Sequence, residues 1–217
     1  MAKKIKSYLE VELIDMFGLT DLTGNDAHPL MAEWLNIPEL NFDVGEMALF
    51  ENIYQNAKSN IKGWQEEDLK MSLIAPILIL GKLQSTKRYY TFFERTIEDT
   101  VEGHFLKTKT DFMVAAGSVG IFKKPFFHFQ EYKPLKNPTG DSMGQLLEAF
   151  LIAQQKNNNG KPMYGCEVIG GTWRFVILKD RTYCVSSPFE ATERHELLQI
   201  IAILRKFKHI LETELLD

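Results

Sequence analysis

Residues 110–134, TDFMVAAGSVGIFKKPFFHFQEYKP, decide the fold, because they read as two short strands joined by a glycine-rich turn. The first strand carries Asp111 at its start, and the second ends in Glu131-Tyr132-Lys133. Residues two apart in a strand project from the same face. We therefore expect Glu131 and Lys133 to point one way and Tyr132 the other.

The charged end of the second strand continues an apolar surface, since Phe127 and Phe129 are expected on the face of Glu131 and Lys133. A carboxylate and an ammonium there are costly unless they pair with each other or with a metal and a substrate. If the two strands are neighbours, Asp111 lies beside Glu131. Two carboxylates and a lysine at one point favour a hard cation, and this is the chemistry of metal-assisted phosphodiester cleavage.

Length and composition indicate an ordinary globular protein of one domain, or one domain with a helical extension. The chain has 217 residues, of which 45% are hydrophobic and 25% charged, and it can bury a sizeable core. Cys166 and Cys184 lack the CxxC spacing of a zinc site and fit a reducing compartment. Acidic residues interrupt the N-terminal apolar residues, and no run is long enough to span a membrane. We expect a soluble cytoplasmic protein without a membrane partner.

The charge distribution is uneven. The net charge is −4, but residues 105–137 hold six lysines against two acidic residues. These lysines are Lys107, Lys109, Lys123, Lys124, Lys133 and Lys136. They fit a solvated lysine-rich surface as well as a positive funnel that draws a polyanion to the carboxylates, and the sequence leaves both interpretations open.

The order of elements predicts an α/β fold, with a mixed sheet flanked by helices on both faces. The expected helices cover residues 4–17, 30–36, 43–60, 64–83, 142–155 and 192–211, with a loop at 18–29. The expected strands lie within residues 86–109, 110–134 and 163–185, with turns at Glu102-Gly103 and Gly170-Gly171. We interpret residues 1–60 as a helical extension or cap without chemistry, and residues 61–217 as the domain that carries the site.

Glu66 begins the expected helix 64–83, which Pro76 should kink or end. An acid in the first turn is explained by the helix dipole alone. Glu66 also shares a side of the helix with Leu69 and Leu73, so it can point along the buried face toward the sheet. In that case it would add a third carboxylate to Asp111 and Glu131.

Together these features resemble the PD-(D/E)XK nuclease superfamily, whose fold is called restriction-endonuclease-like. The resemblance rests on a helix glutamate, then Asp111, then Glu131-Tyr132-Lys133, then a helix that carries a glutamine, over about residues 64–185. Residues 66–78 also look like the opening helix in the N-terminal nuclease domains of type I restriction subunits. Thr110 stands where the family usually has a proline, at a position that varies widely.

The resemblance implies that Asp111 and Glu131 are metal ligands and that the carbonyl of Tyr132 adds a third. Glu66 would approach the same metal directly or through water. Lys133 would position or deprotonate the attacking water, or would hold a phosphate oxygen.

The resemblance also implies a role for Gln145, which matches the helix glutamine that lines some sites of this family. Gln145 fits a helix-capping box with Ser142 equally well.

The function that follows is a Mg²⁺-dependent nuclease, a hydrolase that cuts the phosphodiester bonds of DNA in preference to RNA, with Mn²⁺ as a substitute metal. One alternative is a catalytically silent binding module that keeps the nuclease fold. Another is a nuclease domain that acts only within a larger restriction or repair assembly. A homodimer would bring two such sites to two strands.

Overall fold

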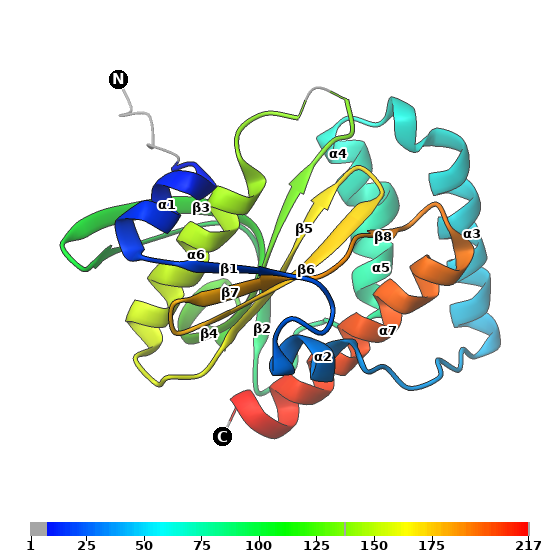
Figure 1. The fold of residues 1–217 in the computed structure, drawn as a ribbon. Helices are drawn as coiled ribbons and strands as arrows, with labels where there is room; N and C mark the ends of the chain where they lie inside the picture. Colours follow the sequence, from blue (N-terminus) through cyan, green and yellow to red (C-terminus); the bar gives the residue numbers. More distant parts are fainter. Residues whose placement is uncertain (1–7, 137, 217) are drawn as a thin grey trace.

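The computed structural model describes residues 8–136 and 138–216, and it has the α/β architecture that the sequence predicts: a mixed eight-stranded sheet with helices on both faces (Figure 1). The helices are α1 Glu10–Phe17, α2 Pro29–Leu35, α3 Val44–Asn60, α4 Glu66–Leu69, α5 Ala75–Leu80, α6 Ser142–Asn157 and α7 Arg194–Ile210. Short 3₁₀ or π turns are η1 Ile61–Gly63, η2 Lys70–Ile74 and η3 Leu211–Leu215.

The strands are β1 Thr20–Thr23, β2 Tyr90–Val101, β3 His104–Ser118, β4 Ile121–Lys133, β5 Met163–Ile169, β6 Thr172–Lys179, β7 Thr182–Val185 and β8 Phe189–Glu190. They form one sheet in the order β1-β7-β6-β5-β4-β3-β2, with β8 on β6. The pairs β1–β7 and β4–β5 are parallel, and the other pairs are antiparallel. The parallel β4–β5 pair is possible because α6 provides the long connection between these strands.

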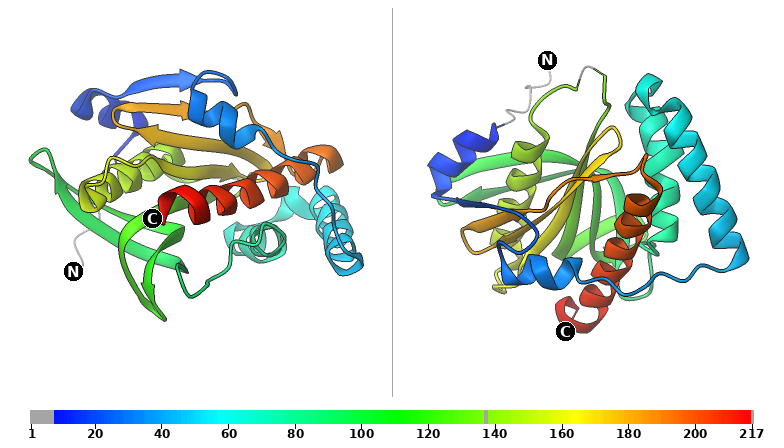
Figure 2. Two further views of the ribbon diagram at one scale, coloured as in Figure 1. Left: turned by 90° about the horizontal axis from the view of Figure 1, so that it is seen from below. Right: turned by 45° about the vertical axis from the view of Figure 1, so that its right-hand side comes forward.

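Helices cover both faces of the sheet (Figures 1 and 2), and each face has its own apolar core. Helix α6 packs on β2–β5, with α1 beside it, and its Phe150 meets Phe129 of β4. The other face carries α2, α3, α5 and α7, where Trp34 contacts the rings of Phe175 and Phe207. Among the described residues, no helix has both the length and the apolar character that a membrane crossing requires.

Strands β3 and β4 form the predicted pair; β3 begins before the predicted range, at His104, whereas β4 lies within residues 110–134. Their register places Phe112 opposite Gln130. The next position brings Asp111 opposite Glu131, because antiparallel register continues residue by residue. The predicted turns at Glu102-Gly103 and Gly170-Gly171 are also confirmed, since each joins two antiparallel strands.

The helical segment over residues 66–80 does not end at Pro76. It continues from α4 through the π turn η2 into α5, where Pro76 occupies one of the first two positions. Proline cannot donate the hydrogen bond of a regular helix, and a widened turn just before it accommodates that loss. Lys70 is the first residue of the widened turn.

The prediction of a loop over residues 18–29 is wrong for residues 20–23. They form the edge strand β1, parallel to β7, with Thr20 opposite Thr182. The sequence gives little local sign of it, because TDLT is short and mostly exposed. The N-terminal segment is therefore not helical throughout, and it shares the core of the remaining chain through Trp34, which is fully buried.

Candidate active site

Asp111 and Glu131 meet at the level where β3 and β4 pair. The backbone N–H of Tyr132 donates a 2.8 Å hydrogen bond to Oδ2 of Asp111. The two carboxyl groups lie close enough that the charge of Asp111 raises the pKa of Glu131. The predicted convergence of these two carboxyls is therefore confirmed, and the Tyr132 N–H fixes the orientation of one of them.

Of the two acids, Glu131 has the less favourable environment for a charged carboxylate. It is 1% exposed, and its Oε1 has no hydrogen-bond partner within the described part of the chain. Burial raises the pKa of Glu131 well above its ordinary value, and the charge of Asp111 raises it further. Burial likewise raises the pKa of Asp111, although the Tyr132 N–H and the ammonium of Lys70 oppose that shift.

Lys133 lies two residues beyond Glu131 on β4 and is 8% exposed. Its charge acts on both carboxyls and lowers the pKa of each, against the larger effect of burial. No carboxylate of residues 8–136 or 138–216 forms an ion pair with its ammonium. Lys133 is therefore a nearby positive charge that remains able to bind an anion.

Lys70 is a second ammonium at the site, which the sequence analysis did not identify. Its Nζ lies 2.9 Å from Oδ1 of Asp111, 2.8 Å from Oε1 of Glu66 and 2.6 Å from Oε1 of Glu94. Burial lowers the pKa of Lys70, but the three carboxylates outweigh burial and raise it above its usual range. Lys70 therefore stays charged and balances part of the acidic cluster.

Glu66 reaches the cluster through Lys70, since both Glu66 and Asp111 pair with that ammonium. Within the described ranges, no three His, Cys, Asp or Glu side chains are grouped as a metal would require. The expected direct approach of Glu66 to Asp111 and Glu131 is thus replaced by an ion-paired lysine. The reason is the helical spacing, because residues four apart share one side of a helix.

Gln145 lies on α6, and no described hydrogen bond joins it to Asp111, Glu131 or Lys133. Its Oε1 is instead near Gly140, 3.7 Å from where a Cβ on that residue would lie. The helix begins at Ser142 as expected, but its N-cap is Asp141, whose carboxylate accepts a hydrogen bond from the N–H of Gly144. The prediction of a capping box between Ser142 and Gln145 is therefore wrong.

Two further acids belong to the same level of the sheet. Glu94 of β2 lies opposite Asp111, between the pairs Phe93–Phe112 and Arg95–Thr110. The predicted turn at Glu102-Gly103 sets the register of the two strands that it joins, and this register would have placed Glu94 opposite Asp111. Glu167 of β5 lies opposite Glu131, and no local signal could have found this partner, because it depends on which strands become neighbours.

Glu94 and Glu167 each have a basic partner. Burial raises the pKa of Glu94, but Lys109 and Lys70 outweigh burial and lower it to about 2. Glu167 pairs with Arg174 and accepts a hydrogen bond from Ser142 at the start of α6. Oε2 of Glu167 accepts no hydrogen bond either, but it lies against Arg174, whereas Oε1 of Glu131 has neither a hydrogen bond nor an ion pair among the described residues.

The lysines of residues 105–137 are spread along the sheet and do not all surround the carboxylates. Lys107 pairs with Glu98, and Lys109 with Glu94. Lys123 is eight residues from Glu131 along β4, about 26 Å away in an extended strand. Of the six lysines, Lys109 and Lys133 are therefore the ones that the contacts and charges associate with the cluster.

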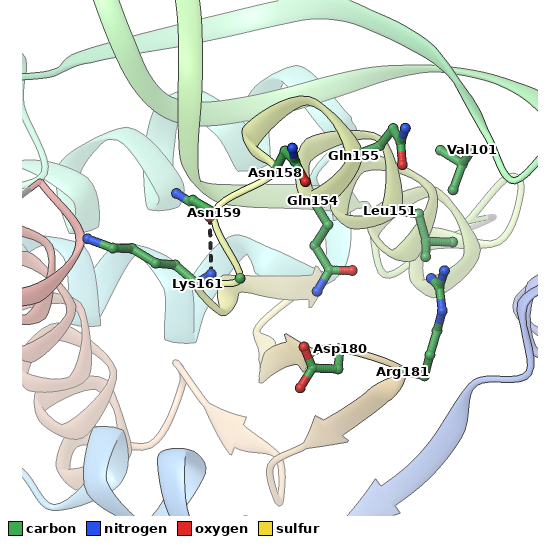
Figure 3. A pocket seen from close by; sticks show the side chains of 10 residues that line it. Val101, Leu151, Gln154, Gln155, Asn158, Asn159, Lys161, Asp180 and Arg181 are labelled. Atoms are coloured by element: carbon green, nitrogen blue, oxygen red, sulfur yellow. Dashed lines mark hydrogen bonds between the residues drawn. The ribbon is translucent and has the colours of Figure 1, made fainter.

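A hollow of about 320 Å³ lies at the far end of α6, away from this cluster (Figure 3). Amide side chains at the end of the helix and in the following loop line it, among them Gln154 and Asn158, and Asp180 and Arg181 face them from the β6–β7 turn. Arg181 is engaged by Glu102 and lies over the ring of Phe17. The hollow contains none of the predicted site residues and offers no paired carboxyls.

No protein-family model matches this chain, and none of the curated proteins matches it. The geometry around Asp111, Glu131 and Lys133 is therefore the starting point for a functional proposal.

Proposed function

We propose that this protein is a Mg²⁺-dependent nuclease of the PD-(D/E)XK type, which hydrolyses phosphodiester bonds of DNA in preference to RNA. The observation that carries the proposal is the contact between two acids with raised pKa values, Asp111 and Glu131, one of which has a buried oxygen without a partner. Such an arrangement is unfavourable in itself, and a bound dication would neutralise both carboxylates.

The side chains present fit Mg²⁺ better than a metal that needs many protein ligands. Mg²⁺ keeps several of its waters and commonly binds through one or two carboxylates together with substrate phosphates. Asp111 and Glu131 would hold it, and the free Oε1 of Glu131 is the ligand atom with no other task. Ligation by the Tyr132 carbonyl stays a prediction, as does ligation by Glu66 through water.

The remaining groups support the same reaction. A bound Mg²⁺ supplies Lewis acidity and a water of lowered pKa. Lys133, which lies beside the carboxyls and forms no ion pair with the described residues, would hold a phosphate oxygen or orient the attacking water. The Tyr132 N–H holds Asp111 in position, and burial of Glu131 keeps bulk water away and strengthens each electrostatic contact.

A second candidate is a module that binds nucleic acid without cutting it. The ion pairs of Lys70 favour this alternative, because an ammonium already neutralises part of the cluster. In that case the acids would serve to hold the fold together through Lys70. Removal of Lys70 would then lower the stability of the protein more than removal of a metal would. A nuclease active only in a larger restriction or repair assembly remains a third proposal, and it would require a partner for activity.

The test is cleavage of labelled single-stranded and duplex oligonucleotides with Mg²⁺ or Mn²⁺, compared with EDTA. Asp111→Asn should reduce the rate at least about 100-fold, because it weakens the metal site while it keeps the shape of the side chain. Glu98→Gln is the matched control, an exposed acid on β2 that pairs with Lys107, and it should cut like the wild type. Equal rates in all three proteins would exclude this active site.

A further inference from the structure

A cavity of about 480 Å³ opens beside the acidic cluster, between the helical segment over residues 66–80 and strand β2. Its lining has two parts. Lys70, Glu94 and Asp111 line it and belong to the cluster already described, and Glu67 adds a further acid. The remaining lining residues, Met71, Ile74, Ala75, Phe93 and Tyr132, form a largely apolar wall. The cavity thus places an apolar surface next to Asp111, one of the two proposed metal ligands, whereas Glu131 and Lys133 are not among its lining residues.

Two residues of the apolar wall are unusually exposed to solvent, although Ile74 beside them is buried. Met71 is 71% exposed and Phe93 51% exposed, although most large apolar side chains of this protein are buried. The ring of Phe93 lies 5.1 Å from that of Phe112, measured between centroids, so the buried Phe112 supports it from below. A supported aromatic ring that faces a cavity is a rigid surface for a flat ligand.

A bend in β2 contributes one residue to each part of the lining, Glu94 to the charged part and Phe93 to the apolar part. Glu94 has a φ of 54°, a left-handed conformation that is unfavourable for a residue with a side chain. It interrupts the pairing of β2 with β3 between Phe93 and Arg95. The bend places the Glu94 carboxylate on Lys70, while the side chain before it lines the cavity.

We propose that this cavity binds one unstacked nucleobase of the substrate, next to the phosphodiester at Asp111, Glu131 and Lys133. The ligand must combine a flat apolar part with a neighbouring anion, and a nucleotide in a flexible strand does so. Bases inside a duplex have both faces covered by their neighbours and cannot enter. The substrate class is therefore single-stranded or locally unpaired nucleic acid, a deduction that rests on the proposed function.

Different residues of the cavity would contact different parts of the nucleotide. Phe93 and Met71 would contact the faces of the base, a contact that tolerates every base and is worth a factor of about 5 to 150 in affinity per base. Lys70 and Glu94 would face its polar edge. The inference therefore predicts preference for a strand conformation without preference for a sequence.

The test measures binding in Ca²⁺, without turnover, of a single-stranded oligonucleotide that carries 2-aminopurine and of its duplex. The wild type should bind the single strand more tightly and should quench the fluorescence of the probe. Phe93→Ala should weaken that binding at least about fivefold and abolish the quenching, because the stacking surface is lost. Met71→Ala should weaken it in the same direction.

Phe105→Ala is the matched control, since Phe105 is 58% exposed on β3 but does not line the cavity. It should bind and quench like the wild type, and circular dichroism should show that all variants are folded. Equal affinity and quenching in Phe93→Ala and Phe105→Ala, or equal wild-type affinity for duplex and single strand, would overturn the inference while cleavage at Asp111 stands. Loss of binding in Phe93→Ala, with no cleavage by the wild type, would keep the base site and reject hydrolysis.

Discussion

Strand β4 carries two buried polar groups, the carboxyl of Glu131 and the imidazole of His128. Their burial lowers the stability of the folded protein. Glu131 belongs to the proposed site, where a ligand would offset its burial. His128 is fully buried, its Nδ1 has no partner within the described residues, and its Nε2 contacts the amide of Gln130 at 2.8 Å. Burial lowers the pKa of His128 to about 3 from the ordinary value of 6.5.

His128 should make the protein sensitive to acid. Because its pKa is depressed in the folded state, the unfolded chain binds one more proton over the interval from 6.5 down to about 3. The free energy of unfolding should therefore be highest above that interval and decrease as the pH falls through it. His128→Gln lacks this titration, so its loss of stability between about pH 7 and pH 5 should be smaller by about 2 kcal/mol.

Urea unfolding at several pH values measures this difference, and only the change with pH matters, because the substitution also alters packing. The matched control is His195→Gln, an exposed histidine at the start of α7. A His128→Gln curve that runs parallel to the wild-type curve would show that His128 is not the buried, neutral group described above.

Lys70 shows how the helical segment over residues 66–80 organises the site at the scale of an element. The π turn that precedes Pro76 begins at Lys70, and its ammonium contacts carboxylates from α4, β2 and β3. A single side chain therefore ties the helix to the bend in β2. The same ammonium competes with any cation for Asp111.

Lys70→Met should destabilise the protein by about 2 kcal/mol in EDTA, because three neighbouring carboxylates lose their shared partner. Added Mg²⁺ should then raise the melting temperature of this variant more than that of the wild type, since the cation no longer competes with an ammonium. Thermal unfolding with and without Mg²⁺ measures both effects.

Lys62→Met serves as the control for Lys70→Met, because Lys62 is exposed in η1 and belongs to no described ion pair. It should leave stability within about 0.5 kcal/mol of the wild type. If Lys70→Met behaves like Lys62→Met under both conditions, the cluster around Lys70 does not hold the helix to the sheet.

The whole molecule behaves as one packed unit across the boundary that the sequence suggested at residue 60. Trp34, Phe50 and Ile53 precede that boundary and are at most 1% exposed, in the same core as Phe175 and Phe207. A chain that begins at residue 61 would expose that core. It should lack cooperative thermal unfolding and bind the dye ANS, whereas cooperative unfolding of the shortened chain would establish an independent domain.

The sequence predicts those parts of the molecule whose signals are local. The helix over residues 43–60, the turn at Gly170-Gly171 and the strand pair that carries Asp111 and Glu131 depend on spacing within one segment, and all three are found. The i, i+4 spacing of Glu66 and Lys70 is equally local, but the sequence does not indicate that Lys70 would stand between Glu66 and Asp111.

Other features depend on contacts between distant segments, and the sequence does not predict them. The pairing of β1 with β7 joins residues 20 and 182, and the position of Glu167 beside Glu131 requires β4 and β5 to be neighbours. The bend at Glu94 depends on a backbone conformation that its residue type disfavours.

The central claim is that Asp111, Glu131 and Lys133 form a hydrolytic site. The most direct measurement is the single-turnover rate of phosphodiester cleavage at saturating Mg²⁺, for the wild type and for Lys133→Ala with the same circular dichroism spectrum. The account predicts cleavage by the wild type and a rate at least about 100-fold lower for Lys133→Ala, because the ammonium proposed to hold the phosphate or orient the attacking water is lost. Equal rates for the two proteins, or no cleavage by either, would contradict it.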